Sequence, residues 1–74
     1  MTDKQLLSAI TECRTNCLAR STNYATLAKS FRAAGVMSTA ITYESISRSF
    51  IAAAERLQCA IEFLSMSEVL SNVL

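Results

Sequence analysis

Three cysteines, Cys13, Cys17 and Cys59, are the residues of this chain best suited to metal or redox chemistry. Cys13 and Cys17 are four positions apart, so both would lie on one face of a helix. A zinc site generally needs four Cys or His ligands, and the sequence contains no histidine. The pair also lacks the C-x-x-C spacing of redox motifs. We therefore expect no metal or cofactor, and we expect the cysteines to be small apolar core residues in a reducing, cytoplasmic setting.

The sequence contains no residues clearly suited to acid–base catalysis or to phosphate binding. The glutamates are dispersed, and only Glu55 and Glu62, seven positions apart, would share a helical face. We expect both to be solvated surface charges. A glycine-rich phosphate loop is ruled out because Gly35 is the single glycine. The sequence therefore predicts a protein that is not an enzyme and has no catalytic residues.

The elements that must position these residues are helices. Of the 74 residues 51% are hydrophobic, one is glycine and none is proline, which is typical of helical proteins. Thr2 and Gln5 match a capping box at the start of a first helix. Apolar residues then recur at spacings of four and three, as in a packing seam that only Arg20 interrupts. This seam contains Leu6, Ile10, Cys13, Cys17, Tyr24, Leu27, Phe31 and Ala34.

Gly35 follows the first seam, where many helices end with one residue in the left-handed conformation. A chain reversal at this glycine predicts an all-α fold, a single-domain antiparallel two-helix hairpin. We expect helices over about 3–34 and about 39–73, with the turn at Gly35–Ser38. The second seam contains Tyr43, Ile46, Phe50, Ala53, Leu57, Ala60 and Leu64, with Ala54 and Ile61 beside it.

The start of the second helix offers several capping residues. Ser38, Thr39 or Thr42 can accept the first backbone hydrogen bonds, and Glu44 would then lie in the first turn, where a negative charge is favourable. Glu44 would also pair with Arg48, four positions later. We expect the capped helix to begin at one of these three residues.

The sequence leaves undecided whether each of the two helices is continuous or interrupted. Residues Ser21–Asn23 are poor helix formers, because their side chains compete for backbone hydrogen bonds, so the first helix can break there. The seam keeps its phase through this segment, which favours one helix. Ser65 and Glu68 match a second capping box, which would start a short C-terminal helix.

The apolar residues outnumber those that two seams can bury. A ridge of apolar residues at helical spacing commonly marks an interaction surface, and a chain of this length gains stability from a partner subunit. We therefore predict partner binding. The partner is either a second copy of the chain, which would form a homo-oligomer such as a four-helix bundle, or another protein. The alternative is a third helical segment that folds back over the ridge. The predicted partner-binding residues are Leu7, Leu18, Ile51, Cys59, Phe63, Met66 and Leu70.

The charges are few and are divided between the halves of the chain. Residues 1–37 carry five basic and two acidic side chains, and residues 38–74 carry two basic and four acidic ones, so the halves have net charges of +3 and −2. The net charge of +1 creates no basic field for nucleic acid. A helix-turn-helix regulator that binds nucleic acid stays an alternative because of the central glycine turn. No apolar run approaches the ~20 residues that a membrane span requires.

This arrangement resembles that of one protein family. The opening "QLLSAITECRTNCLAR", the reversal at Gly35 and the late stretch "AAAERLQCAIEFL", with Leu57, Ala60, Ile61 and Leu64, resemble the small helical-hairpin co-chaperones of the bacterial type III secretion needle subunit, of the YscE, PscE and EscE type. The resemblance implies a larger tetratricopeptide-like partner, which the hairpin stabilises. It also implies that the complex keeps the needle subunit unpolymerised in the cytoplasm. By the same resemblance, Ile51, Phe63 and Met66, with Leu7 and Leu18, would face the partner.

Overall fold

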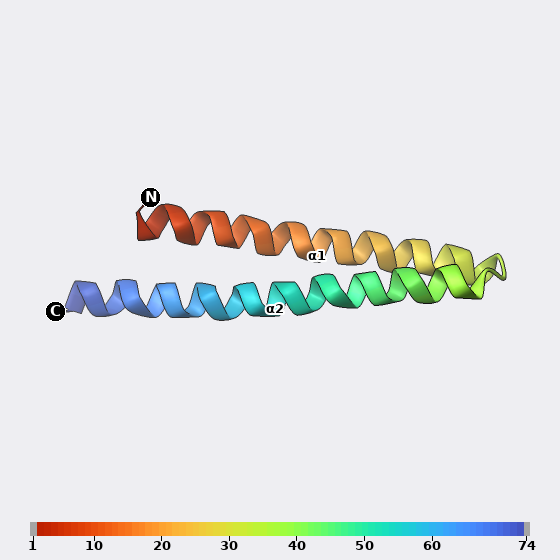
Figure 1. Ribbon diagram of the computed structural model, residues 1–74. Helices are drawn as coiled ribbons and strands as arrows, with labels where there is room; N and C mark the ends of the chain where they lie inside the picture. The colour runs from red at the N-terminus through yellow and green to blue at the C-terminus, as the bar shows by residue number, and fades with distance from the viewer. Residues whose placement is uncertain (1, 74) are drawn as a thin grey trace.

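The chain is a rod of two helices in the computed structural model. Helix α1 (Asp3–Ala33) and helix α2 (Met37–Val73) lie side by side and antiparallel, joined by a short turn (Figure 1). The structure describes the backbone of residues 2–73 and the side chains of residues 2–67 and 69. The Cα positions span 59 × 15 × 14 Å. The prediction of an all-α hairpin is confirmed, and no strand occurs within residues 2–73.

Helix α1 begins with the predicted capping box. The Gln5 backbone N–H donates to Thr2 Oγ1 at 3.2 Å, and the Thr2 backbone N–H donates to Gln5 Oε1 at 2.9 Å. These two bonds satisfy backbone donors that the first turn of a helix leaves without partners. Asp3 adds a negative charge at the positive end of the helix dipole.

Helix α1 ends at the predicted glycine. Gly35 has a φ of +81°, a left-handed conformation that other residues adopt at a cost. The Val36 N–H donates to the Phe31 carbonyl at 2.9 Å, and the Gly35 N–H donates to the Arg32 carbonyl at 3.1 Å. This pair of bonds is the Schellman motif, which satisfies the last carbonyls of α1 while the chain reverses.

Helix α2 begins earlier than the sequence predicted. Its first residue is Met37, and the Ala40 N–H donates to the Val36 carbonyl at 3.1 Å. The predicted caps therefore lie inside the helix, where the Thr42 hydroxyl donates to the Ser38 carbonyl at 3.0 Å. Glu44 is accordingly outside the first turn. The predicted capping by Ser38, Thr39 or Thr42 and the predicted position of Glu44 in the first turn are therefore both wrong. The reason is the Schellman motif, which leads from Gly35 directly into the next helix.

Both helices continue through the segments where an interruption was considered. Helix α1 is unbroken across Ser21–Asn23, and α2 is unbroken through Ser65–Glu68. Many hydroxyls bond back to the carbonyl four residues earlier, as Thr22 does to Leu18 at 3.2 Å and Thr26 to Thr22 at 3.0 Å. These side chains therefore bond within their own helix, and α1 stays helical through them.

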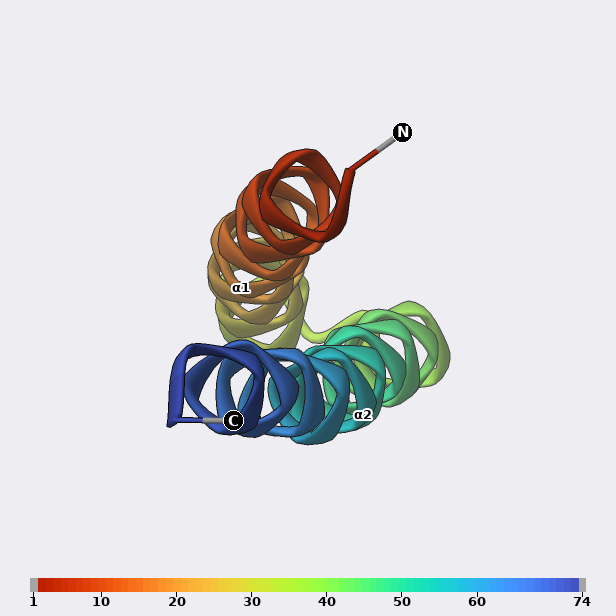
Figure 2. The ribbon, with the colours of Figure 1, turned by 90° about the vertical axis from the view of Figure 1, so that its left-hand side faces the viewer.

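The core between the helices is made of small side chains. No large side chain within the described residues is fully buried. Figure 2 looks along the rod and shows that the helices wind around each other, as a seven-residue spacing of core positions requires. The buried residues, each at most 6% exposed, are Ser21 and Ala28 of α1 and Ala40, Ser47 and Ala54 of α2.

Two of the buried residues join the helices through hydrogen bonds. Ser47 Oγ donates to the Ser21 carbonyl at 2.8 Å, and the Ser21 and Ser47 hydroxyl oxygens are 3.0 Å apart. A serine hydroxyl has one proton, and that of Ser47 is used for the carbonyl. Ser21 must therefore donate to Ser47 Oγ. Each buried hydroxyl donates one hydrogen bond, and the pair fixes the register of α1 against α2.

Candidate functional site

The most exposed apolar side chains lie on the side of α2 that faces away from α1. Phe63 is 72% exposed and Met66 63%, and Cys59 precedes Phe63 by one helical turn. The half-buried Leu57, Ile61 and Leu64 occupy the opposite side of this helix, toward α1. We call the exposed group of Cys59, Phe63, Met66 and Val69 the outer ridge.

The remaining predicted binding residues lie elsewhere. Leu18 and Ile51, 37% and 41% exposed, line a shallow depression of about 310 Å³ between the helices. Ile51 precedes Phe63 by twelve positions, or about 120° around the helix, so the two residues do not form one ridge. Leu7 is half-buried on α1, and the side chain of Leu70 lies outside the described residues.

Charged and polar groups complete the wall of this depression. Arg14, Glu55 and Gln58 line it together with Leu18, Ile51 and Ala54. The Arg14 Nε atom is buried and has no hydrogen-bond partner among the described residues. Gln58 Nε2 donates to Glu62 Oε1 at 3.3 Å, and both Glu55 and Glu62 are exposed, as predicted.

The cysteines occupy different environments from those predicted. Cys13 and Cys59 are exposed, so their assignment as core residues is wrong, whereas Cys17 is half-buried. The center of the α1 seam passes through Cys17, Ser21 and Ala28, which leaves Cys13 at the edge of the seam. No group of three or more His, Cys, Asp or Glu side chains within the described residues is arranged to hold a metal.

Four aromatic side chains from both helices form a continuous stack. Phe31 lies on Tyr43 with ring centroids 5.4 Å apart, Tyr43 on Tyr24 at 5.7 Å, and Tyr24 on Phe50 at 5.7 Å. The Arg20 guanidinium carbon is 6.0 Å from the Phe50 centroid, at the limit of a cation–π contact. The seams contained all four rings. Their order in the stack could not be predicted, because it depends on the register of the helices.

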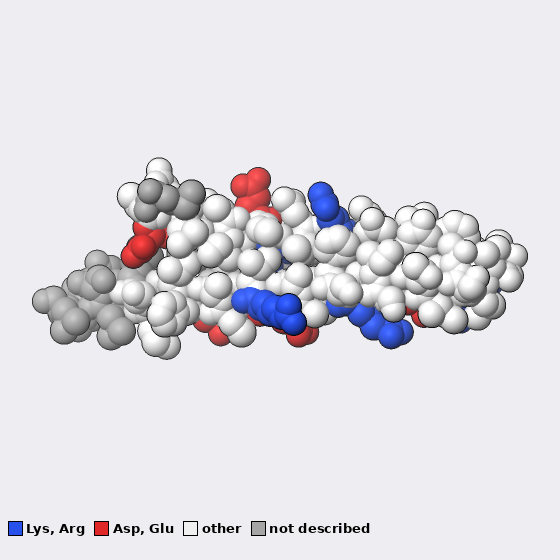
Figure 3. Space-filling model, in the orientation of Figure 1, with Lys and Arg blue, Asp and Glu red and all other residues white. Residues whose placement is uncertain are grey.

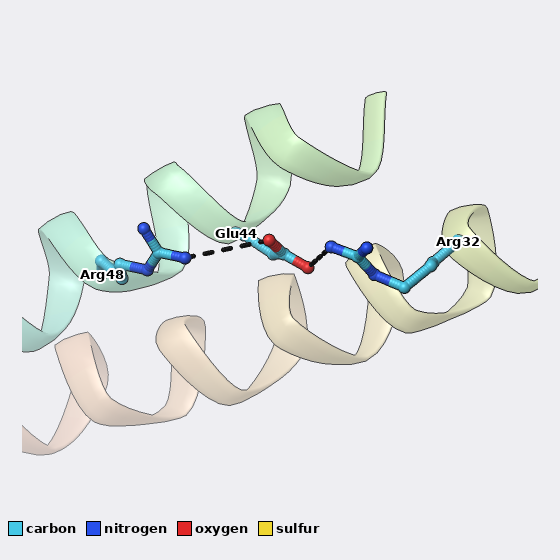
Figure 4. A network of polar contacts seen from close by, with 3 residues as sticks. All are labelled: Arg32, Glu44 and Arg48. Atoms are coloured by element: carbon cyan, nitrogen blue, oxygen red, sulfur yellow. Dashed lines mark hydrogen bonds and ion pairs between the residues drawn. The ribbon is translucent and has the colours of Figure 1, made fainter. Parts of the chain in front are cut away.

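An ion-pair network occupies a different side of the hairpin, near the turn. Glu44 bonds to Arg32 of α1 and lies 3.8 Å from Arg48 of its own helix, as Figure 4 shows. The predicted Glu44–Arg48 pair is confirmed, and the link to Arg32 joins the helices. Exposed pairs of this kind contribute roughly 0–1 kcal/mol each, so the network orients the helices more than it stabilises them.

Charged groups are sparse on the face of the molecule seen in Figure 3, especially near the turn. The helices are antiparallel neighbours, unlike the helices of a helix-turn-helix motif, which meet at about 90–120°. Within residues 2–73, neither helix combines the length and the apolar character that crossing a membrane requires.

Comparison with known protein families, curated proteins and solved structures finds no match for this chain.

Proposed function

We propose that this chain is a non-enzymatic binding subunit that acts as a co-chaperone of the type III secretion kind. The outer ridge would contact a larger tetratricopeptide-like partner. Together the two proteins would keep a needle subunit unpolymerised in the cytoplasm before export. The resemblance of the sequence to such hairpins suggests the partner and the client.

The exposure of the outer ridge is the observation that carries this proposal. A Phe side chain that leaves water contributes roughly 1.5–3 kcal/mol, yet Phe63 is 72% exposed. Met66, one turn later, is 63% exposed on the same side of α2. An aromatic side chain beside a methionine is typical of the residues that anchor protein interfaces. Within residues 2–67 no other side chain covers Phe63 and Met66, because the ridge faces away from α1.

A binding subunit of this kind acts by mass action. A protein that binds only the folded partner stabilises it by about 2.7 kcal/mol when its free concentration is 100 times the Kd. Likewise, a client held as a monomer is removed from its polymerisation equilibrium. The proposal therefore requires affinity and a stable apolar surface, and it requires no reactive group.

Affinity capture from the native cell tests the proposal. A tagged wild-type chain is expected to capture a tetratricopeptide-like protein, and Phe63→Asp together with Met66→Asp is expected to abolish the capture. Thr26→Asp is the matched control, because Thr26 is exposed on α1, and it should retain the partner. Retention of every partner by the ridge variant would contradict the proposal, as would capture of no repeat protein by the wild type. Circular dichroism should show equal helix content in all three proteins.

A further inference from the structure

A second apolar surface lies on another side of the hairpin, around the aromatic stack. Arg20 contacts Phe50, which places this side of α1 next to the stack. Cys13 and Leu27 are each seven positions from Arg20 and therefore share its side of α1. Both are exposed, Leu27 at 42%. On α2, Ile46 lies one turn from both Tyr43 and Phe50 and is half-buried.

We call this surface the aromatic face: the four stacked rings with Cys13, Arg20, Leu27 and Ile46. Arg20 is its one charged residue, and the guanidinium lies near the Phe50 ring. The aromatic face is separate from the depression between the helices, because Leu18 lies about 200° around α1 from Arg20. It runs along both helices, whereas the outer ridge belongs to α2 alone.

The hairpin exposes more surface than a compact monomer of the same mass. A compact monomer of 8.1 kDa exposes roughly 4,500 Å² by the usual scaling of area with mass. This hairpin exposes 5455 Å². The hairpin therefore exposes roughly 1,000 Å² more than a compact monomer. In a standard stable interface each partner buries about 800 Å², which is a similar area.

The charges of the two helices favour a second copy of the chain as the occupant. Helix α1 carries five basic and two acidic residues, a net charge of +3, and α2 carries two basic and four acidic residues, a net charge of −2. Two hairpins packed face to face place each α1 either against the partner's α1 or against its α2. Only the second arrangement brings opposite charges together.

We infer that two copies associate through their aromatic faces to form an antiparallel four-helix bundle. The two-fold axis runs along the rod, so that α1 of each copy packs against α2 of the other and both turns lie at the same end. Every neighbouring pair of helices is then antiparallel, as in other four-helix bundles. Arg20 keeps its charge at the edge of the bundle by extending its aliphatic part across the apolar surface.

Molar mass in solution tests the occupant. Sedimentation equilibrium of the wild-type chain should give twice the 8.1 kDa of one copy. Leu27→Asp should give the monomer with unchanged helix content, because this side chain is already exposed in the hairpin. Ile41→Asp is the matched control, because Ile41 is exposed on another side of α2, and it should stay dimeric. A monomeric wild type, an open-ended polymer, or a dimer that survives Leu27→Asp combined with Ile46→Asp would overturn the inference.

The arrangement of the two copies has its own test. Spin labels at Ser38→Cys, an exposed position at the start of α2 outside the aromatic face, report the distance between the two turns in a chain with Cys13→Ala, Cys17→Ala and Cys59→Ser. The same-end bundle places the labels within roughly 30 Å, because neighbouring helices lie about 8–10 Å apart. Turns at opposite ends would separate them by nearly the 59 Å length of the rod and would overturn the charge-directed arrangement.

The dimer and the proposed partner complex use different surfaces. Phe63→Asp with Met66→Asp should abolish capture of the partner while the chain stays dimeric. Leu27→Asp should abolish the dimer. A failure of one inference is therefore visible separately from a failure of the other.

Discussion

Ser21 shows how a single polar side chain can define the core of a small hairpin. It belongs to the segment that the sequence marks as a weak helix former, yet it is among the most buried residues of the chain. Its hydroxyl donates to Ser47 Oγ, and its carbonyl accepts from the same group. A buried hydroxyl is costly without a partner, so the observed register, which pairs the two serines, is favoured over registers that separate them.

Substitution of these two serines should have unequal effects. Ser47→Ala removes both cross-helix bonds and leaves the Ser21 hydroxyl buried without its partner, which we expect to cost about 1–3 kcal/mol of unfolding free energy. Ser21→Ala leaves the bond from Ser47 to the Ser21 carbonyl intact, and we expect a smaller loss of about 0.5–1.5 kcal/mol. Urea denaturation followed by circular dichroism measures both values.

The double variant and an exposed control complete this experiment. Ser21→Ala with Ser47→Ala should be more stable than the sum of the single effects, because no buried hydroxyl is left without a partner. Ser49→Ala removes an exposed hydroxyl that bonds to the Ser45 carbonyl within α2, and it should change stability by less than about 0.5 kcal/mol. If Ser21→Ala costs as much as Ser47→Ala, the assignment of the donors is incorrect.

At the scale of the elements, the sequence predicted those features that depend on neighbouring residues. The capping box at Thr2, the termination at Gly35 and the Glu44–Arg48 pair each need only a few adjacent positions, and all three are present. The seam predicted for α2 from Tyr43 to Leu64 lies beside the buried centre of the helix, because its residues are half-buried whereas Ala40, Ser47 and Ala54 are buried.

Features that depend on the register between helices could not be predicted. Ala40 and Ser47 are the centre of the α2 seam, but small and polar residues carry little weight in an apolar pattern. The aromatic stack needs Phe31 opposite Tyr43, and no local pattern states which residues face each other. The exposed position of Cys13 follows for the same reason, because the true seam is rotated toward Ser21 and Ala28.

The turn provides a test at this scale. Gly35→Ala should destabilise the hairpin by about 1–2 kcal/mol, since a left-handed conformation brings the added Cβ close to the following carbonyl oxygen. A Cβ at this position meets no other atom within 4 Å, so the cost arises from the backbone alone. Gly35→Asn should cost less, because asparagine tolerates this conformation better. Thermal unfolding of the three proteins measures the order, and an alanine variant as stable as the asparagine variant would contradict it.

The whole molecule is a thin rod whose stability should depend on its own concentration. Dimerisation stabilises the folded chain by mass action, so the Tm of the wild type should rise as the protein is concentrated. Leu27→Asp should have a lower Tm that does not change with concentration. Calorimetry over a wide range of concentrations measures both. A wild-type Tm independent of concentration would show that the hairpin is stable alone.

The simple topology of this hairpin has a consequence for how it forms. Tyr43 follows Phe31 by twelve residues, whereas Ser47 follows Ser21 by twenty-six, so contacts farther from Gly35 close longer loops. Loop closure becomes less favourable with length, by about 0.6 kcal/mol for each doubling. The helices should therefore zip together from the turn, and the open end should form last and fray first. The outer ridge lies toward the end of the hairpin that is far from the turn. A partner bound there would therefore hold the two helices together where their own contacts form last.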